Sequence, residues 1–304
     1  MKQLQVNDGI QVFKSNNNNK LIIRNYSSGK YFTVEFQRSL YEILLFLKEP
    51  RTFDELKTVF SFLTSQCIDE MLSFFIEQKI VRVLEKDAIQ KKINILVVGV
   101  GTTGGFTVEA LCRNDIFKNL ILVDPDIVEI SNLYRQVYLE HEIGEYKAQA
   151  LKNRFPQKNI KCYKQFVSNL DELLAICLEE DIDLIVQCAD KPSSKELCRI
   201  VTSVCNILEK PCILNYGYLS NVIALPEFYY PNNTYNMDYR HDILDEELIL
   251  SQILEKSDYT VSIQASFVIA EQIKNYIENK KPIYYQYRGY FSIEKLKWEV
   301  EKIE

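Results

Sequence analysis

The spacing of apolar residues changes near residue 88 of this chain. Before that point, residues 21–27 and 30–36 are rich in β-branched and aromatic side chains and flank a Ser-Ser-Gly turn, which predicts a β-hairpin. Apolar residues at helical spacing predict helices over 38–48, from Thr52 onward and over 65–79, followed by a short strand over 80–84. Strands combined with three helices predict a winged-helix-like α+β domain over residues 1–88.

From residue 93 onward, continuous apolar runs alternate with stretches of helical periodicity. Continuous apolar runs are typical of parallel strands that are covered on both faces. The expected strands cover 93–99, 119–124, 161–166, 183–190 and 211–217, and the expected helices cover 103–113, 147–155, 170–180 and 193–209. We therefore predict a doubly wound, mostly parallel α/β domain over residues 89–304.

The composition is that of a folded, cytoplasmic protein. The 304 residues are enough for two domains, and the 47% of apolar residues excludes disorder over most of the chain. With 36 basic against 42 acidic residues the net charge is −6, which argues against binding to nucleic acid or to an anionic membrane surface. We find neither an apolar run long enough to span a membrane nor the apolar core of a signal peptide, so we expect a cytoplasmic location.

Cysteine and histidine spacing argues against several metal and hydrolase sites. The chain has eight cysteines and two histidines, and none of the cysteines is paired as C-x-x-C. Structural zinc sites are usually built from such pairs, and disulfides are rare in a reducing compartment. We therefore expect no zinc site and interpret the cysteines in apolar runs as small buried hydrophobic residues. No metalloprotease helix and no G-x-S-x-G elbow is present.

The first candidate for chemistry is a glycine loop at the end of the first apolar strand. Gly99, Gly101 and Gly104 form a G-x-G-x-x-G motif that leads directly into a predicted helix. Glycines allow the tight turn and let main-chain N–H groups approach a phosphate at the helix N-terminus. Asp124 ends the next strand, about 20 residues further on, where a carboxylate reaches a ribose hydroxyl in such folds. The combination predicts an adenine nucleotide site and does not separate NAD from ATP.

The residues after Asp124 favour ATP. Hydride transfer has no use for the Asn-x-x-Arg-Gln element found there, whereas cleavage of the α–β bond of ATP needs cations on the triphosphate and a carboxylate for Mg²⁺. Arg135 and Lys147 can supply the cations, and Asp190, at the end of a predicted strand, can supply the carboxylate. Each alone has a structural explanation, as a surface charge, a helix-face lysine or a helix N-cap. Their order behind a glycine loop is far more specific.

This order of residues resembles the ThiF/MoeB superfamily of adenylating enzymes related to ubiquitin-activating enzyme. The resemblance rests on the string D-x-D-x-V-E-x-S-N-L-x-R-Q over residues 124–136 and covers residues 93 to 230 well. It implies a homodimeric enzyme that uses ATP and Mg²⁺ to form an acyl-adenylate on the C-terminal carboxyl group of a polypeptide. The implied roles are ATP binding by Gly99, Gly101, Gly104 and Asp126, ribose contact by Asp124, phosphate contact by Asn132, Arg135, Gln136 and Lys147, and Mg²⁺ binding by Asp190, with Arg135, Lys147 and Asp190 as the catalytic residues.

The N-terminal domain resembles the PqqD-like peptide-clamp domain, or RiPP recognition element, of peptide-adenylating enzymes of the MccB type. In that family the leader of a small precursor peptide adds as a strand to the small sheet. The helix expected over 65–79 carries Asp69, Glu70 and Glu77 against Lys79 alone, which disfavours DNA binding. Residues 210–218 also resemble the strand that enters the substrate crevice of those enzymes.

The sequence departs from the superfamily pattern in three respects. The paired zinc cysteines are absent, no cysteine matches the catalytic cysteine of the ubiquitin-activating branch, and residues 85–92 lack the arginine that many members lend to the partner subunit's ATP. Arg82, Lys86 and Lys91 are the candidates to replace that arginine.

Two functions from different classes remain open. The first is ATP-dependent adenylation of a precursor peptide in natural-product or bacteriocin biosynthesis, and the second is non-catalytic delivery of a bound leader peptide to another modifying enzyme. The presence of Arg135, Lys147 and Asp190 together favours the enzyme, because a pure scaffold has no use for all three. An NAD-dependent reductase is a third interpretation, which leaves the Arg135-Gln136 element unexplained.

Overall fold

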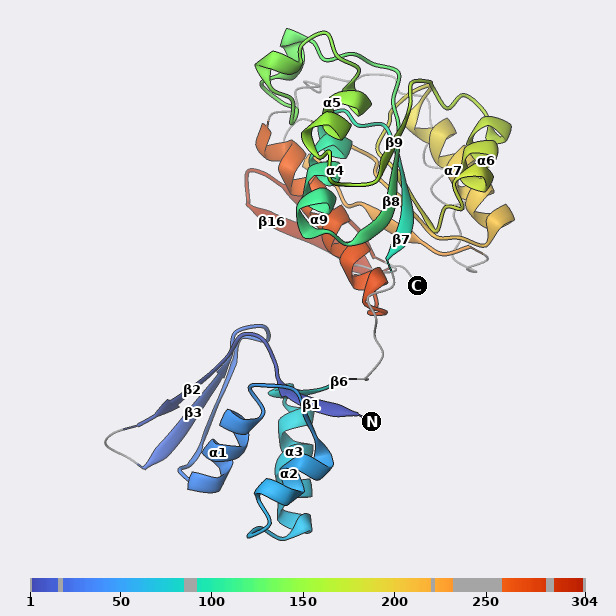
Figure 1. Cartoon of the computed structure of the whole chain (residues 1–304). Helices are drawn as coiled ribbons and strands as arrows, with labels where there is room; N and C mark the ends of the chain where they lie inside the picture. The colour runs from blue at the N-terminus through green and yellow to red at the C-terminus, as the bar shows by residue number, and fades with distance from the viewer. Residues whose placement is uncertain are drawn as a thin grey trace. The chain divides into compact units, whose positions relative to one another are not determined.

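The computed structural model describes residues 2–15, 19–84, 92–219, 222–231, 259–282 and 287–302. The chain divides into two compact units, residues 1–89 and 90–304 (Figure 1). Each unit has a hydrophobic core of its own. In the ranges given above, no helix combines the length and the apolar character that crossing a membrane requires.

The described residues of the N-terminal unit form two small antiparallel sheets and three helices. One sheet has the order β2-β3-β4 and consists of β2 (Ile10–Lys14), β3 (Lys20–Asn25) and β4 (Lys30–Glu35). The other has the order β5-β1-β6 and consists of β5 (Arg51–Thr52), β1 (Gln3–Val6) and β6 (Val81–Leu84). The helices are α1 (Arg38–Phe46), α2 (Phe53–Val59) and α3 (Ser65–Glu77). The predicted hairpin, helices and last strand are all present, whereas β1, β2 and β5 were not predicted.

Local sequence explains where α2 begins. The Thr52 hydroxyl accepts a hydrogen bond of 3.2 Å from the Glu55 N–H, and the Glu55 carboxylate accepts one of 2.7 Å from the Thr52 N–H. This reciprocal capping box satisfies two N–H groups that the first turn leaves unpaired. The three helices then pack their apolar faces against β1 and β3 in one core, which contains Leu4, Ile23, Ile43, Leu56 and Phe75.

The larger unit is built on a six-stranded sheet with the order β14-β11-β10-β7-β8-β9. Its strands are β7 (Ile93–Val98), β8 (Phe117–Val123), β9 (Ile160–Tyr163), β10 (Leu184–Gln187), β11 (Cys212–Leu214) and β14 (Glu227–Tyr229). The first five are parallel, and β14 runs antiparallel to β11. The predicted doubly wound, mostly parallel α/β fold is therefore confirmed.

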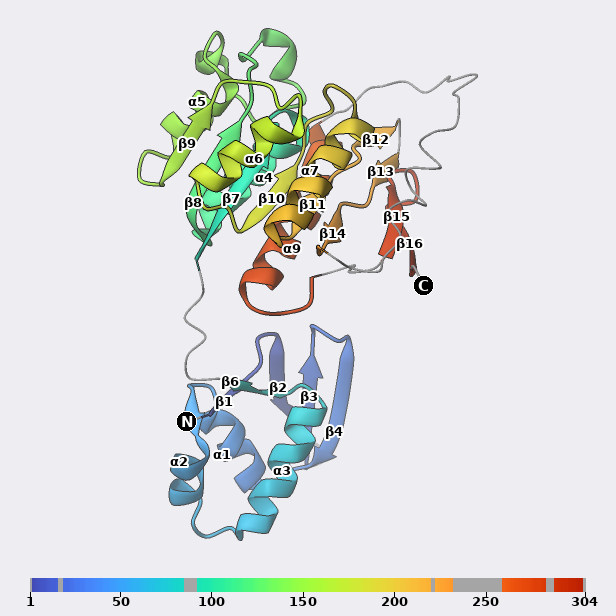
Figure 2. The same ribbon diagram turned by 90° about the vertical axis from the view of Figure 1, so that its right-hand side faces the viewer.

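Helices cover both faces of this sheet (Figure 2). One face packs against α4 (Thr102–Asn114), α5 (Lys147–Arg154) and α9 (Tyr259–Ile277), and the other packs against α6 (Leu170–Glu179) and α7 (Ser194–Leu208). All six residues of β7 are buried as a result, which explains the continuous apolar run in the sequence.

No element after residue 217 was predicted. In addition to β14 and α9, the structure contains a four-stranded sheet with the order β12-β13-β15-β16. Its strands are β12 (Tyr218–Leu219), β13 (Val222–Ala224), β15 (Tyr287–Ser292) and β16 (Lys297–Lys302). The main sheet is what positions the site, because β10, β7 and β8 are neighbours and their carboxyl ends lie side by side.

Candidate functional site

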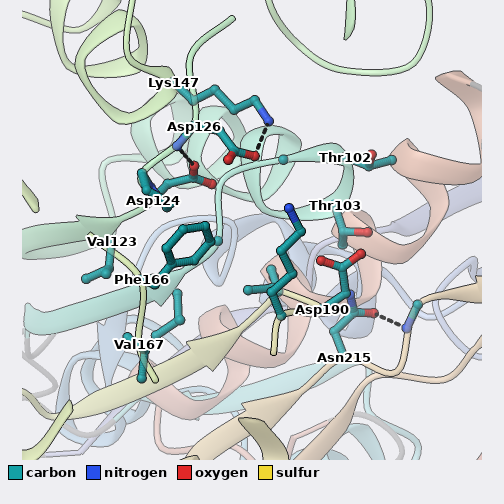
Figure 3. A pocket seen from close by; sticks show the side chains of 18 of the residues that line it. Thr102, Thr103, Val123, Asp124, Asp126, Lys147, Phe166, Val167, Asp190 and Asn215 are labelled. Atoms are coloured by element: carbon teal, nitrogen blue, oxygen red, sulfur yellow. Dashed lines mark hydrogen bonds and ion pairs between the residues drawn. The ribbon is translucent and has the colours of Figure 1, made fainter. Parts of the chain in front are cut away.

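A cavity of about 530 Å³ lies at the carboxyl ends of β7, β8 and β10 (Figure 3). Strand β7 has β8 on one side and β10 on the other, so the cavity is at the switch point where such sheets bind ligands. Eight of the ten predicted site residues line it, namely Gly99, Gly101, Asp124, Asp126, Arg135, Gln136, Lys147 and Asp190. Gly104 and Asn132 do not line it.

The glycine loop keeps one side of the cavity open. A Cβ atom at Gly104 would lie 2.0 Å from the carbonyl oxygen of Gly99, so this glycine lets α4 pack closely on the loop. Gly99 has a φ of +84° and a Cβ atom there would lie 2.6 Å from the Ala189 nitrogen. A Cβ atom at Gly101, the N-cap of α4, would have the Gln136 side chain as its nearest described neighbour outside the adjoining residues and the helix itself, at 3.8 Å. The loop therefore leaves space for a ligand at the helix N-terminus, where main-chain N–H groups favour an anion.

The side chain of Asp124 connects the glycine loop to the turn that follows β8 by hydrogen bonds. One carboxylate oxygen accepts a hydrogen bond of 2.7 Å from the Val100 N–H, and the other accepts one of 2.8 Å from the Asp126 N–H. Burial raises the pKa of the Asp124 carboxyl above its ordinary value, although these two hydrogen bonds oppose the shift. Asp124 thus supports the loop as well as lining the cavity, where it can meet a ribose hydroxyl.

Lys147 begins α5 and forms an ion pair with Asp126 across the cavity wall (Figure 3). The Nζ atom lies 2.9 Å from the Asp126 carboxylate, and the Lys147 N–H donates to the Asp126 carbonyl at 2.9 Å. The lysine side chain is only 7% exposed, whereas that of Asp126 is 46% exposed. The ion pair therefore keeps the ammonium group of Lys147 buried at the cavity, and the Asp126 carboxylate partly neutralises its charge.

Arg135 and Gln136 follow a short 3₁₀ turn that Asn132 stabilises. The N–H groups of both residues donate to the Asn132 carbonyl, at 3.1 and 2.8 Å. The Asn132 side chain accepts a hydrogen bond of 2.9 Å from the Glu129 N–H, so it shapes the turn and lies outside the cavity lining. Arg135 Nε and Gln136 Oε1 are buried without a hydrogen-bond partner among the described residues. Buried polar atoms are normally paired. A polar ligand in the cavity could supply the missing partners, accepting a hydrogen bond from Arg135 Nε–H and donating one to Gln136 Oε1.

Asp190 follows β10 and presents an exposed carboxylate at the cavity. Helix α7 is capped by Ser193, whose hydroxyl accepts a hydrogen bond of 3.1 Å from the Glu196 N–H, so Asp190 is not its N-cap. The carboxylate has no hydrogen-bond or ion-pair partner in the part of the chain that the structure describes, and this fits a role as an oxygen ligand for Mg²⁺.

A metal enclosed by protein ligands alone does not fit this site. Among the residues with a described position, no group of three or more histidine, cysteine, aspartate and glutamate side chains is arranged to hold a metal ion. Mg²⁺ commonly keeps one or two carboxylates and takes its remaining ligands from phosphates and water. The absence of zinc stays a prediction, because residues 232–258 lie outside the described ranges.

Two buried serines of α9 also support the site, and neither was predicted from the sequence. The Ser266 hydroxyl donates to the Thr103 carbonyl at 2.7 Å, and the Ser262 hydroxyl donates to the Arg135 carbonyl at 2.9 Å. Their spacing of four residues inside an apolar stretch was the available signal. Phe166 and Lys191 also line the cavity without having been predicted, whereas Asn215 belongs to the segment 210–218 that was expected to enter the crevice.

A glycine loop, a buried acid and cations at the switch point of a doubly wound sheet are typical of nucleotide-binding proteins. The ThiF family model matches residues 76–297, so the chain belongs to the ThiF family. Adenylyltransferase and sulfurtransferase UBA4 of Candida albicans is 30% identical over 143 residues, which are 45% of this chain and 31% of that protein. Ubiquitin-like modifier-activating enzyme 5 of Bombyx mori is 30% identical over 128 residues, which are 38% of this chain and 32% of that protein. The match thus spans about a third of the length of these relatives.

The fold is also similar to that of a solved structure over almost its whole length. The structure of E. coli MccB with ATP covers 100% of this chain and 97% of its own chain, with a TM-score of 0.74 and 16% identity. The structure of E. coli MccB with MccA-N7isoASN covers 99% and 97%, with a TM-score of 0.73 and 15% identity. The two proteins therefore share a fold.

Proposed function

We propose that this protein is an ATP-dependent adenylyltransferase that activates the C-terminal carboxyl group of a small ribosomally made peptide. The observation that carries the proposal is that Arg135, Lys147 and Asp190 meet the open side of the glycine loop in one cavity. Membership of the ThiF family and relatives named adenylyltransferases support it. All eight cysteines are free, and we expect the reaction to take place in the cytoplasm, where ATP is available and thiols stay reduced.

The residues of the cavity suit the charge changes of adenylation. A carboxylate oxygen of the peptide attacks the α-phosphorus of ATP, the bond between that phosphorus and the oxygen leading to the β-phosphate breaks, and pyrophosphate leaves with the electron pair. Negative charge grows on the phosphate oxygens during this step, so fixed positive charges accelerate it. Arg135, Lys147 and the N–H groups at the start of α4 would supply them. Mg²⁺ held through Asp190 would neutralise further phosphate charge.

The test is exchange of labelled pyrophosphate into ATP in the presence of peptides encoded beside this gene. Asp190→Asn keeps the size of the side chain and removes the carboxylate, and we expect it to slow exchange by about 100-fold, a magnitude typical for loss of one electrostatic contact to the transition state. Asp181→Asn, at an exposed position in the turn before β10 and outside the cavity lining, is the matched control and should leave exchange unchanged. Unchanged exchange in Asp190→Asn would contradict the role of Asp190. Nucleotide-independent peptide binding without any exchange would favour a delivery subunit instead.

We propose that the N-terminal unit binds the leader of this peptide. Strand β4 is an edge of the β2-β3-β4 sheet, and an edge strand can pair with an added strand through main-chain hydrogen bonds. Solved structures of E. coli MccB, which share this fold, include MccB with MccA. Titration of the full-length protein with the labelled peptide and with random duplex DNA, at low and moderate salt, tests this. Peptide binding should depend weakly on salt, and salt-sensitive DNA binding without peptide binding would overturn the proposal.

We propose further that the protein is a homodimer. Tyr259, Ile263 and Phe267 lie four residues apart on α9 and are 49%, 41% and 58% exposed, so they form an apolar stripe on one side of the helix. Ile130 and Tyr134, on the segment leading to Arg135, are also exposed. Analytical ultracentrifugation should find a dimer that Phe267→Glu converts to a monomer, and a monomeric wild-type protein would contradict this.

A further inference from the structure

Phe166 and Lys191 come from two different loops and meet at the nucleotide cavity. Phe166 follows β9 and remains 52% exposed, although it lines the cavity together with Val123 and Val167 (Figure 3). Lys191 follows Asp190 directly, and its Nζ atom lies 5.8 Å from the centroid of the Phe166 ring. This ring is the only partner of the Lys191 side chain in the described part of the chain.

The ring of Phe166 is suited to a planar apolar ligand. A half-exposed aromatic side chain beside aliphatic ones offers a flat apolar surface. Nucleobases stack on such rings whatever the identity of the base, because every base has a flat π-face. The ring lies next to Asp124, the residue expected at the ribose, and the base of a bound nucleotide is attached to that sugar (Figure 3).

Lys191 is a cation of the cavity lining that no carboxylate of the described residues neutralises. Lys147 is already paired with Asp126, whereas Arg135 has a buried Nε without a partner among the described residues. Lys191 has no carboxylate partner within these residues, and its distance from the ring is close to the upper limit for a cation–π contact, about 6 Å. The ammonium group is therefore weakly held in the free protein and can move to a stronger partner.

We infer that Phe166 stacks on the base of the bound nucleotide and that Lys191 then leaves the ring and pairs with the phosphates. This inference rests on the proposed binding of ATP and names the residues that recognise its two ends. The base covers the ring face against which the ammonium group lies, and the released cation is next in sequence to Asp190, the residue expected at the phosphate-bound Mg²⁺. The contact between Lys191 and Phe166 is thus lost on binding. Phe166 gains a contact with the base, and Lys191 gains a contact with the phosphates.

Calorimetric titration of the full-length protein with adenosine and with ATP, in the absence of peptide, separates the two roles. Phe166→Ala should weaken both ligands by about tenfold, because both carry the base. Lys191→Met should weaken ATP by about fivefold, an effect that salt reduces, and should leave adenosine unchanged or slightly tighter. Phe166→Tyr should bind both ligands as the wild type does. Phe62→Ala and Lys118→Met, two exposed positions outside the cavity lining, are the matched controls.

The outcomes distinguish this inference from the proposed reaction. Equal affinity of Phe166→Ala and wild type for adenosine would overturn stacking, and equal weakening of adenosine and ATP by Lys191→Met would overturn pairing with phosphates. If the expected pattern is found but no peptide supports pyrophosphate exchange, adenylation is wrong and the inference stands. If exchange is normal and both variants bind as the wild type does, only the inference is wrong. A wild-type protein that binds neither ligand would reject both.

Discussion

The hydroxyl group of Ser262 donates a hydrogen bond of 2.9 Å to the main-chain carbonyl of Arg135, 127 residues earlier in the chain. One turn further along α9, the Ser266 hydroxyl donates to the carbonyl of Thr103 in the first turn of α4. Both serines are buried, and neither lines the cavity. Helix α9 therefore ties together the two segments that carry the glycine loop and the candidate phosphate-binding arginine.

Replacing Ser262 by alanine removes the anchor of the Arg135 main chain. We expect Ser262→Ala to lower the free energy of unfolding by about 1 kcal/mol, a common cost for one hydrogen bond, and to weaken ATP binding several-fold because Arg135 is less well positioned. Urea unfolding and nucleotide titration measure the two effects. Ser73→Ala, at an exposed position of α3, is the control. ATP affinity equal to that of the wild type would show that the contact is structural only.

Two glycines of the loop should respond differently to the addition of one methyl group. Gly104→Ala places a Cβ atom 2.0 Å from the Gly99 carbonyl oxygen, so α4 must shift, and we expect a loss of about 1–3 kcal/mol in stability. Gly101→Ala has its nearest described neighbour, beyond the adjoining residues and the helix itself, at 3.8 Å and should cost less stability, but its methyl group enters the space kept for a phosphate. Thermal unfolding with and without ATP compares the two. The prediction is wrong if Gly101→Ala is the less stable variant or retains full ATP affinity.

The parts of this structure that the sequence predicts are those with local signals. Strands β7, β10 and β11 are runs of buried, mostly apolar residues because both of their faces are covered, and the glycine loop is a contiguous motif. Strand β1 has a single buried residue, Leu4, so it leaves no recognisable alternation. The contacts of Ser262 and Ser266 span more than one hundred residues and depend on where α9 packs, which no local pattern indicates.

The roles of individual site residues were less predictable than their presence at the site. The string of residues 124–136 brings Arg135 and Gln136 to the cavity, but Asn132, in the same string, turns its side chain to the Glu129 main chain. A sequence motif preserves residues that shape a turn together with those that face a ligand. Only the hydrogen-bond pattern of the folded chain separates the two groups.

Substitutions of Lys147 and Asp126 should affect catalysis and the free energy of unfolding to different extents. We expect Lys147→Met to reduce pyrophosphate exchange at least tenfold, because a cation on the triphosphate is lost. Its effect on the free energy of unfolding should stay within about 1 kcal/mol, since Asp126 is half exposed and can be solvated. Asp126→Asn should cost more stability than Lys147→Met, because it leaves the buried ammonium group without its partner. Urea unfolding of both variants tests the order, and the double variant should be more stable than Asp126→Asn alone.

The buried carboxyl group of Asp124 should leave a signature in the pH dependence of stability. Burial raises its pKa in the folded protein above the ordinary value of about 3.9. Between that value and the raised pKa, the folded state holds more protons than the unfolded chain, so the contribution of Asp124 to stability falls as the pH rises and is constant above the raised pKa. An asparagine side chain does not titrate, so the variant Asp124→Asn provides the reference.

We expect Asp124→Asn to be less stable than the wild type by about 1–3 kcal/mol, because the amide NH₂ group, a donor, replaces one of the two oxygens that accept the bonds from the Val100 and Asp126 N–H groups. The difference between the two proteins should be largest near pH 4 and should shrink toward neutral pH, since ionisation of a buried group weakens the wild type alone. Urea unfolding at intervals from pH 4 to pH 8, with Asp69→Asn as the control for a lost surface charge, measures it. A difference that grows with pH would mean that the two main-chain hydrogen bonds outweigh burial and hold the pKa of Asp124 below its ordinary value.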